Sequence, residues 1–76
     1  MKAMEAVKKV MELKSIRMAD LTDMLGEPPR SSKIAMRFYQ DNVSVAKLDE
    51  MLRVMGYKIV IMPREANTPK DSFRIE

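Results

Sequence analysis

The chain has 76 residues and contains neither cysteine nor histidine. A chain of this length buries only about 60% of the surface that its unfolded form exposes, so its stability is marginal unless a cross-link, a metal or a partner adds to it. Disulfides and the usual zinc sites are excluded, because the residues that form them are absent. We therefore expect association with a second copy of the chain.

The rest of the composition is that of an ordinary soluble domain, with 46% hydrophobic and 33% charged residues. No apolar run approaches the roughly 18 residues of a membrane span, and charges interrupt the opening "MKAMEAVKKVMELK", so no membrane partner and no signal peptide are expected. A cytoplasmic location is the expectation. Because most nucleophile–base pairs and metal-ligand sets need histidine or cysteine, we expect no enzymatic activity, no metal and no cofactor.

Apolar residues recur every three or four positions in four segments, which predicts four helices. They cover residues 3–14, 18–25 and 32–40, and a fourth helix that Ser44 caps and Gly56 ends. The residues expected to face inward are Ala3, Ala6, Val7, Val10, Met11 and Leu13; Leu21, Met24 and Leu25; Ile34, Ala35 and Phe38; and Val45, Leu48, Met51, Leu52 and Met55. Met18 and Met36 are expected to be exposed.

After Gly56 the period changes from helical to alternating. The stretch "YKIVIM", residues 57–62, is rich in β-branched residues and stops at Pro63, which predicts a short strand. A lone strand leaves its edge unpaired, so it needs a partner. That partner is either residues 72–76, in a hairpin, or the same strand of a second copy. We thus divide the chain into residues 1–56 and a strand and tail, 57–76, with these candidate dimerisation residues: Tyr57, Ile59, Val60, Ile61 and Met62.

The third predicted helix has a polar outer face, formed by Ser32, Lys33, Met36, Arg37 and Gln40. Arg30 and Ser31 precede it. Arginine can pair with guanine and glutamine with adenine, and a helix N-terminus favours a phosphate. The first 40 residues also carry eight Lys/Arg against five Asp/Glu, whereas residues 41–76 carry six of each. This face could therefore bind an anionic partner, although a solvated polar surface has the same pattern.

A short helix, a glycine-containing turn and a helix with a polar outer face form the helix-turn-helix arrangement. The stretch from Ile16 to Pro63 resembles the phage Cro/cI-repressor type (Xre) helix-turn-helix family, and is most similar to its small phage and Firmicute members. The matching positions are Leu25, Gly26, Ser31, Ser32, Arg37, Phe38, Asn42, Ser44, Val45, Leu48, Met51, Leu52, Met55, Gly56, Tyr57 and Pro63.

The resemblance implies a mainly α, four-helix, lambda-repressor-like helix-turn-helix domain with a short C-terminal β-strand or hairpin. It also implies a sequence-specific DNA-binding transcriptional regulator, acting as a repressor, that binds a short palindromic operator in double-stranded DNA as a homodimer through the helix at 32–40. The DNA-binding residues expected on this basis are Arg17, Arg30, Ser31, Ser32, Lys33, Met36, Arg37, Gln40, Asn42 and Ser44.

The chain departs from the family where members usually have Thr-Gln at the start of the second helix. Arg17 and Met18 occupy these positions. Arginine is a poor N-cap, although its charge could replace the phosphate contact that glutamine makes.

Two alternatives belong to other functional classes. A phage-encoded protein could use the same scaffold to bind and inhibit a host defence complex, in which case Met18, Met36 and the acidic residues Asp20 and Asp23 would matter. An antitoxin that represses its own operon is the second alternative. Otherwise Asp20 and Asp23 are expected to be solvated surface residues.

Overall fold

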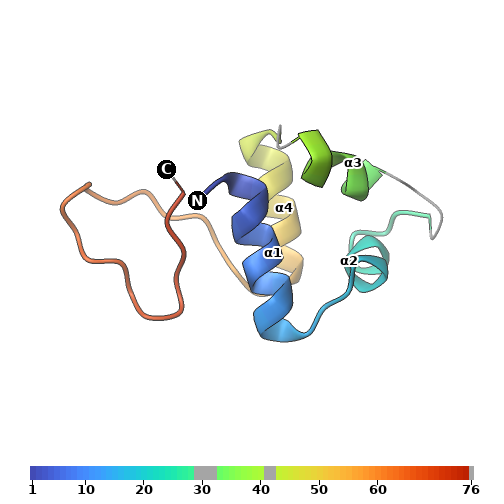
Figure 1. Ribbon diagram of the computed structural model, residues 1–76, viewed down its shortest axis with the longest axis horizontal. Helices are drawn as coiled ribbons and strands as arrows, with labels where there is room; N and C mark the ends of the chain where they lie inside the picture. Colours follow the sequence, from blue (N-terminus) through green and yellow to red (C-terminus); the bar gives the residue numbers. More distant parts are fainter. Residues whose placement is uncertain (29–32, 41–42, 76) are drawn as a thin grey trace.

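The computed structural model describes residues 1–28, 33–40 and 43–75, with only the backbone of Tyr39. These residues form four helices, α1 (Ala3–Lys14), α2 (Met18–Met24), α3 (Lys33–Gln40) and α4 (Val45–Val54). Helices α1 and α4 pack side by side, and α2 and α3 lie together at one end of the molecule (Figure 1). The residues after α4 form an extended tail at the other end (Figure 1). The expected mainly helical fold is confirmed.

Every helix contributes at least one completely buried side chain to a single core. The largest of them are Leu21, Ile34, Met51, Val7 and Val10. Full burial of such a side chain stabilises the fold by about 1.5–3 kcal/mol. Because Ile34 belongs to α3 and Leu21 to α2, this core sets the positions of both short helices against the α1–α4 pair.

Most residues expected to face inward are buried, four are half-buried, namely Ala3, Leu25, Ala35 and Phe38, and three are exposed. Leu13, Met24 and Val45 are exposed. Each lies in the first or last turn of its helix, where the helix extends beyond the packed centre and apolar spacing no longer guarantees a neighbour. Met4 was missed and is buried, one turn before Val7 on the same side of α1. Met18 and Met36 are exposed, as expected.

Three helices end in a residue with left-handed backbone conformation. Gly26 and Gly56 have φ values of 73° and 85°, so both predicted stop positions are confirmed. Ser15 does the same after α1, with a φ of 54°. In each case an N–H group bonds a carbonyl five residues back, as in a Schellman motif. These bonds join Ile16 to Met11, Glu27 to Thr22 and Tyr57 to Leu52, at 2.8, 3.1 and 2.8 Å.

The strand predicted for residues 57–62, and its hairpin with residues 72–75, are not formed within the described chain. The returning segment meets residue 57 through side chains instead, because the rings of Tyr57 and Phe73 stack with centroids 6.5 Å apart. Between them the chain turns twice, where Ala66 bonds the carbonyl of Pro63 and Ser72 bonds that of Pro69. The hairpin is therefore not confirmed in the described residues, and pairing between two copies stays a prediction.

No helix in the described ranges combines the length and the apolar character that crossing a membrane requires.

We expect Ser15→Gly to raise the free energy of unfolding by about 1 kcal/mol, since a side chain at a left-handed position is strained and glycine is not. Thermal and urea unfolding followed by circular dichroism measure the change. Ser72→Gly is the matched control, because Ser72 is also exposed but has no positive φ. The prediction would be contradicted if the free energy of unfolding of Ser15→Gly were no higher than that of Ser72→Gly.

Candidate nucleic-acid interface

Helix α3 is amphipathic, as expected. Ile34 is only 1% exposed, and Phe38 packs against the same core, so these two side chains attach the helix to the molecule. Lys33, Met36 and Gln40 are exposed on the other side, and 48% of Met36 is accessible to solvent. In a helix these three positions lie within one narrow arc, next to Arg37. The outer face of α3 therefore presents one cation, one thioether and one amide to solvent.

Arg37 differs from the expectation that it stands clear of the protein. Its side chain is half-buried, and its Nε atom is buried without a hydrogen-bond acceptor among the described residues. The position of Arg37 on the helix explains this, because it lies between exposed Lys33 and buried Ile34 around the axis. A buried donor without an acceptor costs about 1–3 kcal/mol, so an acceptor brought to Arg37 by a ligand would recover part of that cost.

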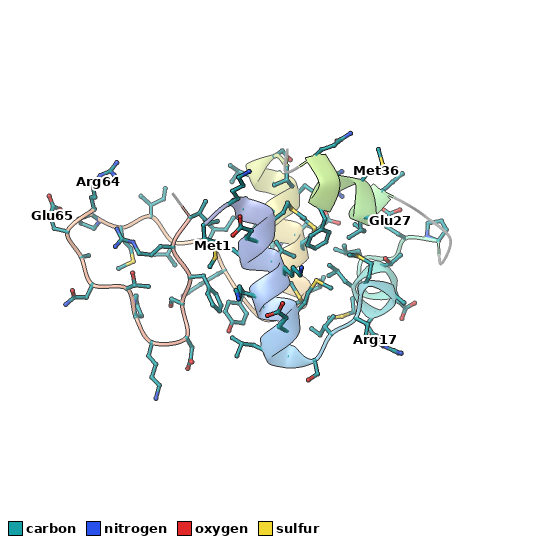
Figure 2. The ribbon with its side chains drawn as sticks, in the orientation of Figure 1. Met1, Arg17, Glu27, Met36, Arg64 and Glu65 are labelled. Carbon is teal, nitrogen blue, oxygen red and sulfur yellow. The ribbon has the colours of Figure 1, made fainter. Side chains whose placement is uncertain are left out.

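An acidic residue that was not predicted lies beside α3. Glu27, in the turn after α2, places its carboxylate 4.0 Å from the Nζ atom of Lys33. The Glu27 side chain is 20% exposed and that of Lys33 is 72% exposed. Glu27 and Met36 lie near each other at the α2–α3 end, far from Arg64 and Glu65 in the tail (Figure 2). No local spacing in the sequence indicates this pair, because it bridges the turn between two helices.

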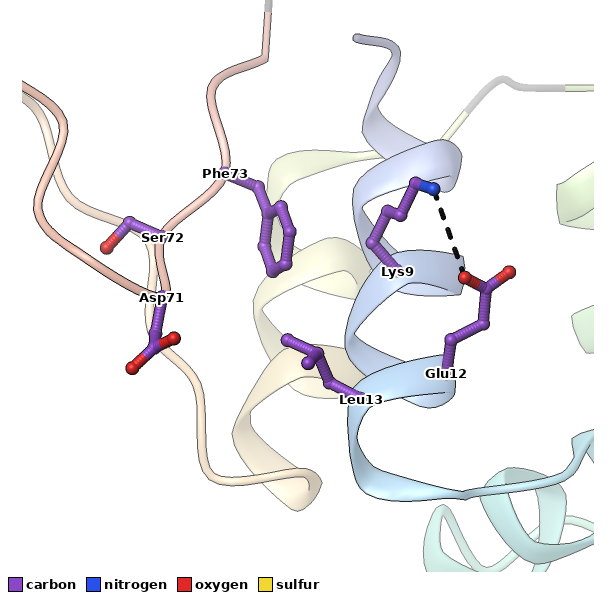
Figure 3. A pocket seen from close by; sticks show the side chains of 6 residues that line it. All are labelled: Lys9, Glu12, Leu13, Asp71, Ser72 and Phe73. Carbon is purple, nitrogen blue, oxygen red and sulfur yellow. Dashed lines mark ion pairs between the residues drawn. The ribbon is translucent and has the colours of Figure 1, made fainter.

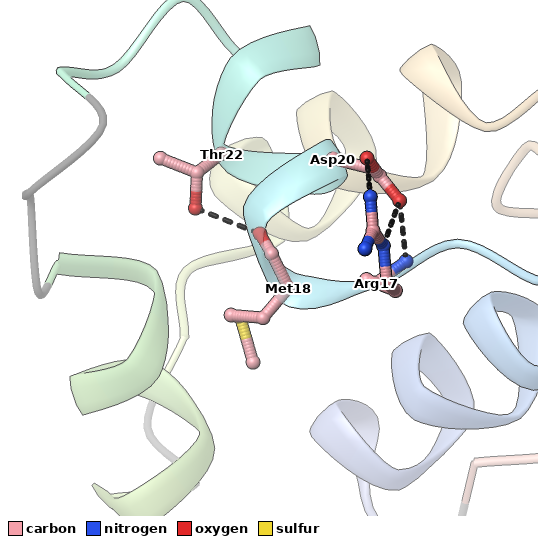
Figure 4. Close-up of polar contacts among 4 residues, drawn as sticks. All are labelled: Arg17, Met18, Asp20 and Thr22. Atoms are coloured by element: carbon pink, nitrogen blue, oxygen red, sulfur yellow. Dashed lines mark hydrogen bonds and ion pairs between the residues drawn. The ribbon is translucent and has the colours of Figure 1, made fainter.

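Arg17 is bound by Asp20 at the start of α2 (Figure 4). One oxygen of the Asp20 carboxylate accepts from the backbone N–H of Arg17 at 2.9 Å and from its Nε at 3.2 Å. This is the half of a capping box in which the third helical residue reaches back, so α2 begins well although its N-cap is arginine. Asp20 was expected to be a solvated surface residue, and its i, i+3 spacing from Arg17 was the missed signal.

The electrostatics of this pair follow from its hydrogen bonds. The backbone N–H of Arg17, and next its side chain, hold the pKa of Asp20 below its ordinary value. The hydrogen bond from Arg17 to Asp20 raises the pKa of Arg17 in turn. Nearby, the hydroxyl of Thr22 donates to the carbonyl of Met18 at 2.9 Å, which satisfies a polar side chain that is otherwise buried (Figure 4).

Ser44 caps α4, as predicted. Its Oγ atom accepts from the backbone N–H of Lys47 at 3.2 Å. The side chain is exposed, so it lies at the surface where α4 begins. Four other predicted site residues lie outside the described ranges: Arg30, Ser31, Ser32 and Asn42.

A shallow groove of about 500 Å³ separates α1 from the end of the tail (Figure 3). Apolar Leu13 and Phe73 line it together with the ion pair of Lys9 and Glu12, whose charged atoms are 3.9 Å apart. The tail that lines one side of this groove lies at the end of the molecule away from α3 (Figure 1).

Comparison with known protein families, with curated proteins and with solved structures finds no match to this chain.

We expect the Asp20 carboxyl to titrate below its ordinary pKa of about 3.8 and, in Arg17→Ala, to titrate closer to that value without reaching it. The variant loses the side-chain contact but keeps the backbone donor, which is the larger cause of the shift. Carbon-detected NMR of the carboxyl group measures both midpoints. Because the folded-state pKa is lowered, the stabilisation by this pair is present above pH 3.8 and is lost as the pH falls through the folded value.

An Asp20 midpoint at or above 3.8 in the wild type would contradict the contact, and so would a midpoint that Arg17→Ala leaves unchanged.

Proposed function

We propose that this protein is a sequence-specific DNA-binding transcriptional regulator of the phage Cro/cI-repressor type, and that it binds a short palindromic operator as a homodimer. The observation that carries the proposal is the outer face of α3. Its side chains Lys33, Met36 and Gln40 are exposed at one end of the molecule, while Ile34 holds the helix rigidly against the core.

The arrangement of α2 and α3 supports this function. The two helices contact each other, α2 also contacts α4, and α3 also contacts α1. In a helix-turn-helix protein the second helix enters the major groove while the first crosses the DNA backbone. We therefore assign α3 as the recognition helix and α2 as the helix that crosses the backbone.

Each exposed side chain of α3 has a role that its chemistry allows. Gln40 can pair with adenine, and Met36 offers an apolar contact to a thymine methyl group. Lys33 supplies a charge for guanine or phosphate. Arg37 brings a guanidinium whose buried Nε lacks an acceptor among the described residues, and a phosphate or a base edge would provide one.

The other DNA contacts follow from the resemblance. Arg17 contacts phosphate from the start of α2, and Ser44 does so from the start of α4, where its hydroxyl is exposed. Arg30, Ser31, Ser32 and Asn42 complete the surface. A promoter occupied in this way is blocked to transcription, which makes the protein a repressor.

Residues 59–62 provide the dimer contact in this proposal. All four are apolar and exposed, and Ile61 is 98% exposed. They leave α4 on the side of the helices away from α2 and α3 (Figure 1). Antiparallel pairing with the same segment of a second copy would satisfy their backbone groups and cover their side chains. Such a pairing leaves the outer face of α3 open to DNA.

One observation favours a second function. Met18 and Met36 are both exposed at the α2–α3 end, and exposed methionine suits a protein-binding surface. An inhibitor of a host defence complex built on this scaffold would use that surface without contacting DNA.

For DNA binding, we expect log K for the operator to fall linearly with log salt, with a slope that reflects several phosphates per dimer. Duplexes selected from a random pool supply the operator. Gln40→Ala should weaken operator binding by about 1–3 kcal/mol and scrambled-duplex binding far less, because it removes a base contact. Lys70→Ala, in the exposed tail, is the control and should change neither affinity. A slope near zero would favour the protein-binding function instead.

For the dimer, we expect Ile61→Lys to weaken self-association by at least roughly 100-fold, because each of the two subunits would lose a buried isoleucine worth about 1.5–3 kcal/mol. Sedimentation equilibrium measures the dissociation constant. Val45→Lys is the matched control, since Val45 is also an exposed β-branched residue but lies on α4. If the wild type is monomeric at high concentration, or both variants dimerise alike, residues 59–62 are not the interface.

A further inference from the structure

We propose that Asp20 and Glu27 are internal counter-ions, which compete with DNA phosphates for Arg17 and Lys33 and so weaken the protein's hold on DNA of any sequence. The inference rests on the proposed DNA-binding function and deepens it. It assigns the two acids a role in setting how strongly, and with what salt dependence, the protein contacts the DNA backbone.

The first counter-ion is attached firmly to its cation. Asp20 accepts from the Nε atom of Arg17 at 3.2 Å and lies 3.5 Å from its Nη2 atom, while the backbone N–H of Arg17 holds the same carboxylate in place. The side chain of Arg17 is 83% exposed, so a phosphate can reach it. A phosphate that binds there must either share the guanidinium with a carboxylate or displace it.

The second counter-ion is held by the turn rather than by its cation. The backbone N–H of Glu27 bonds the carbonyl of Thr22, which ties this residue to the end of α2, and its side chain is 20% exposed. Lys33 is the more exposed member, because 72% of its side chain is accessible to solvent and its Nζ atom lies 4.0 Å from the carboxylate of Glu27. Lysine can therefore exchange Glu27 for a phosphate, but the acid stays beside it.

Folding stability accounts for these pairs only in part, through the bond from the backbone N–H of Arg17 to Asp20 that caps α2. Exposed ion pairs between side chains contribute little to folding, with a median of about 0–1 kcal/mol. Their position suggests a different effect. Arg17 is the N-cap residue of α2 and Lys33 is the first residue of α3, and both cations belong to the proposed DNA interface. Arg17, Glu27 and Met36 all lie at the end of the molecule opposite the tail (Figure 2).

The energetic consequence follows from counter-ion release. Each phosphate that a protein cation neutralises steepens the plot of log K against log salt by about 0.9. A cation that keeps its own carboxylate neutralises a phosphate only in part, and it also brings a negative charge towards the duplex. Both effects weaken binding and flatten the salt dependence. Non-operator DNA is held almost entirely by such phosphate contacts, so its affinity falls by a larger fraction than that of the operator.

The test compares single-charge substitutions in the full chain on a duplex without the operator. Asp20→Asn and Glu27→Gln each remove one negative charge, and asparagine can still accept from the backbone N–H of Arg17. Asp23→Asn is the matched control, because it makes the same charge change on the exposed side of α2. Thermal unfolding of each variant establishes that the fold is retained.

We expect Asp20→Asn and Glu27→Gln each to bind the duplex on the order of tenfold more tightly at about 0.1 M salt, with a slope steeper by up to about 1.8 per dimer, because each substitution releases one cation in each subunit. In the double variant the two fold-changes in affinity should multiply and the two changes in slope should add. Asp23→Asn should bind with an affinity and a slope close to those of the wild type. If wild-type binding is salt-dependent but Asp20→Asn and Glu27→Gln behave like Asp23→Asn, the counter-ion inference is overturned and the proposed function stands. If neither the wild type nor any variant binds duplex DNA, both are overturned.

Discussion

The contact on which the rest of the structure depends is the insertion of Ile34 of α3 into the core, where α3 packs against α1 and α2. Helix α3 has only eight residues, and a helix of that length is unstable by itself in water. Its conformation and its direction therefore come from packing, with Ile34 fully buried and Phe38 against the same cluster. Once the inner side of α3 is attached, the outer side is determined, because residues three and four positions apart share a face.

The charges around this helix do not form a simple cationic surface. The net charge of +3 and the excess of Lys/Arg in the first 40 residues are the basis for predicting an anionic partner. In the folded chain, however, Arg17 is bound by Asp20, and Lys33 lies beside Glu27. A count of charges along the sequence overestimates the cations that are fully available, because it does not include pairs formed between neighbouring elements. The strength with which such a surface would bind an anion depends on how many of its cations are already paired within the protein.

In the tail, by contrast, a segment with the apolar pattern of a strand has no partner strand among the described residues. Residues 59–62 have the composition of a strand, yet a strand exists only when another backbone supplies its hydrogen bonds. The tail returns to the helices through the Tyr57–Phe73 stack, and Lys14 lies 5.8 Å from the centroid of the Tyr57 ring. These side-chain contacts close the loop without pairing its two arms, which leaves the apolar residues exposed.

The sequence by itself determined the helices. Their apolar spacing and the two glycines predicted the limits of α1, α2 and α4 to within about one residue, because helix formation and termination depend on local geometry. It also determined which residues of α3 face outward, apart from Arg37. Only the tertiary structure decided that Leu13 and Val45 are exposed, that Arg37 is half-buried and that Glu27 lies beside Lys33. These properties depend on which other element stands next to a residue, and that information is absent from any local pattern.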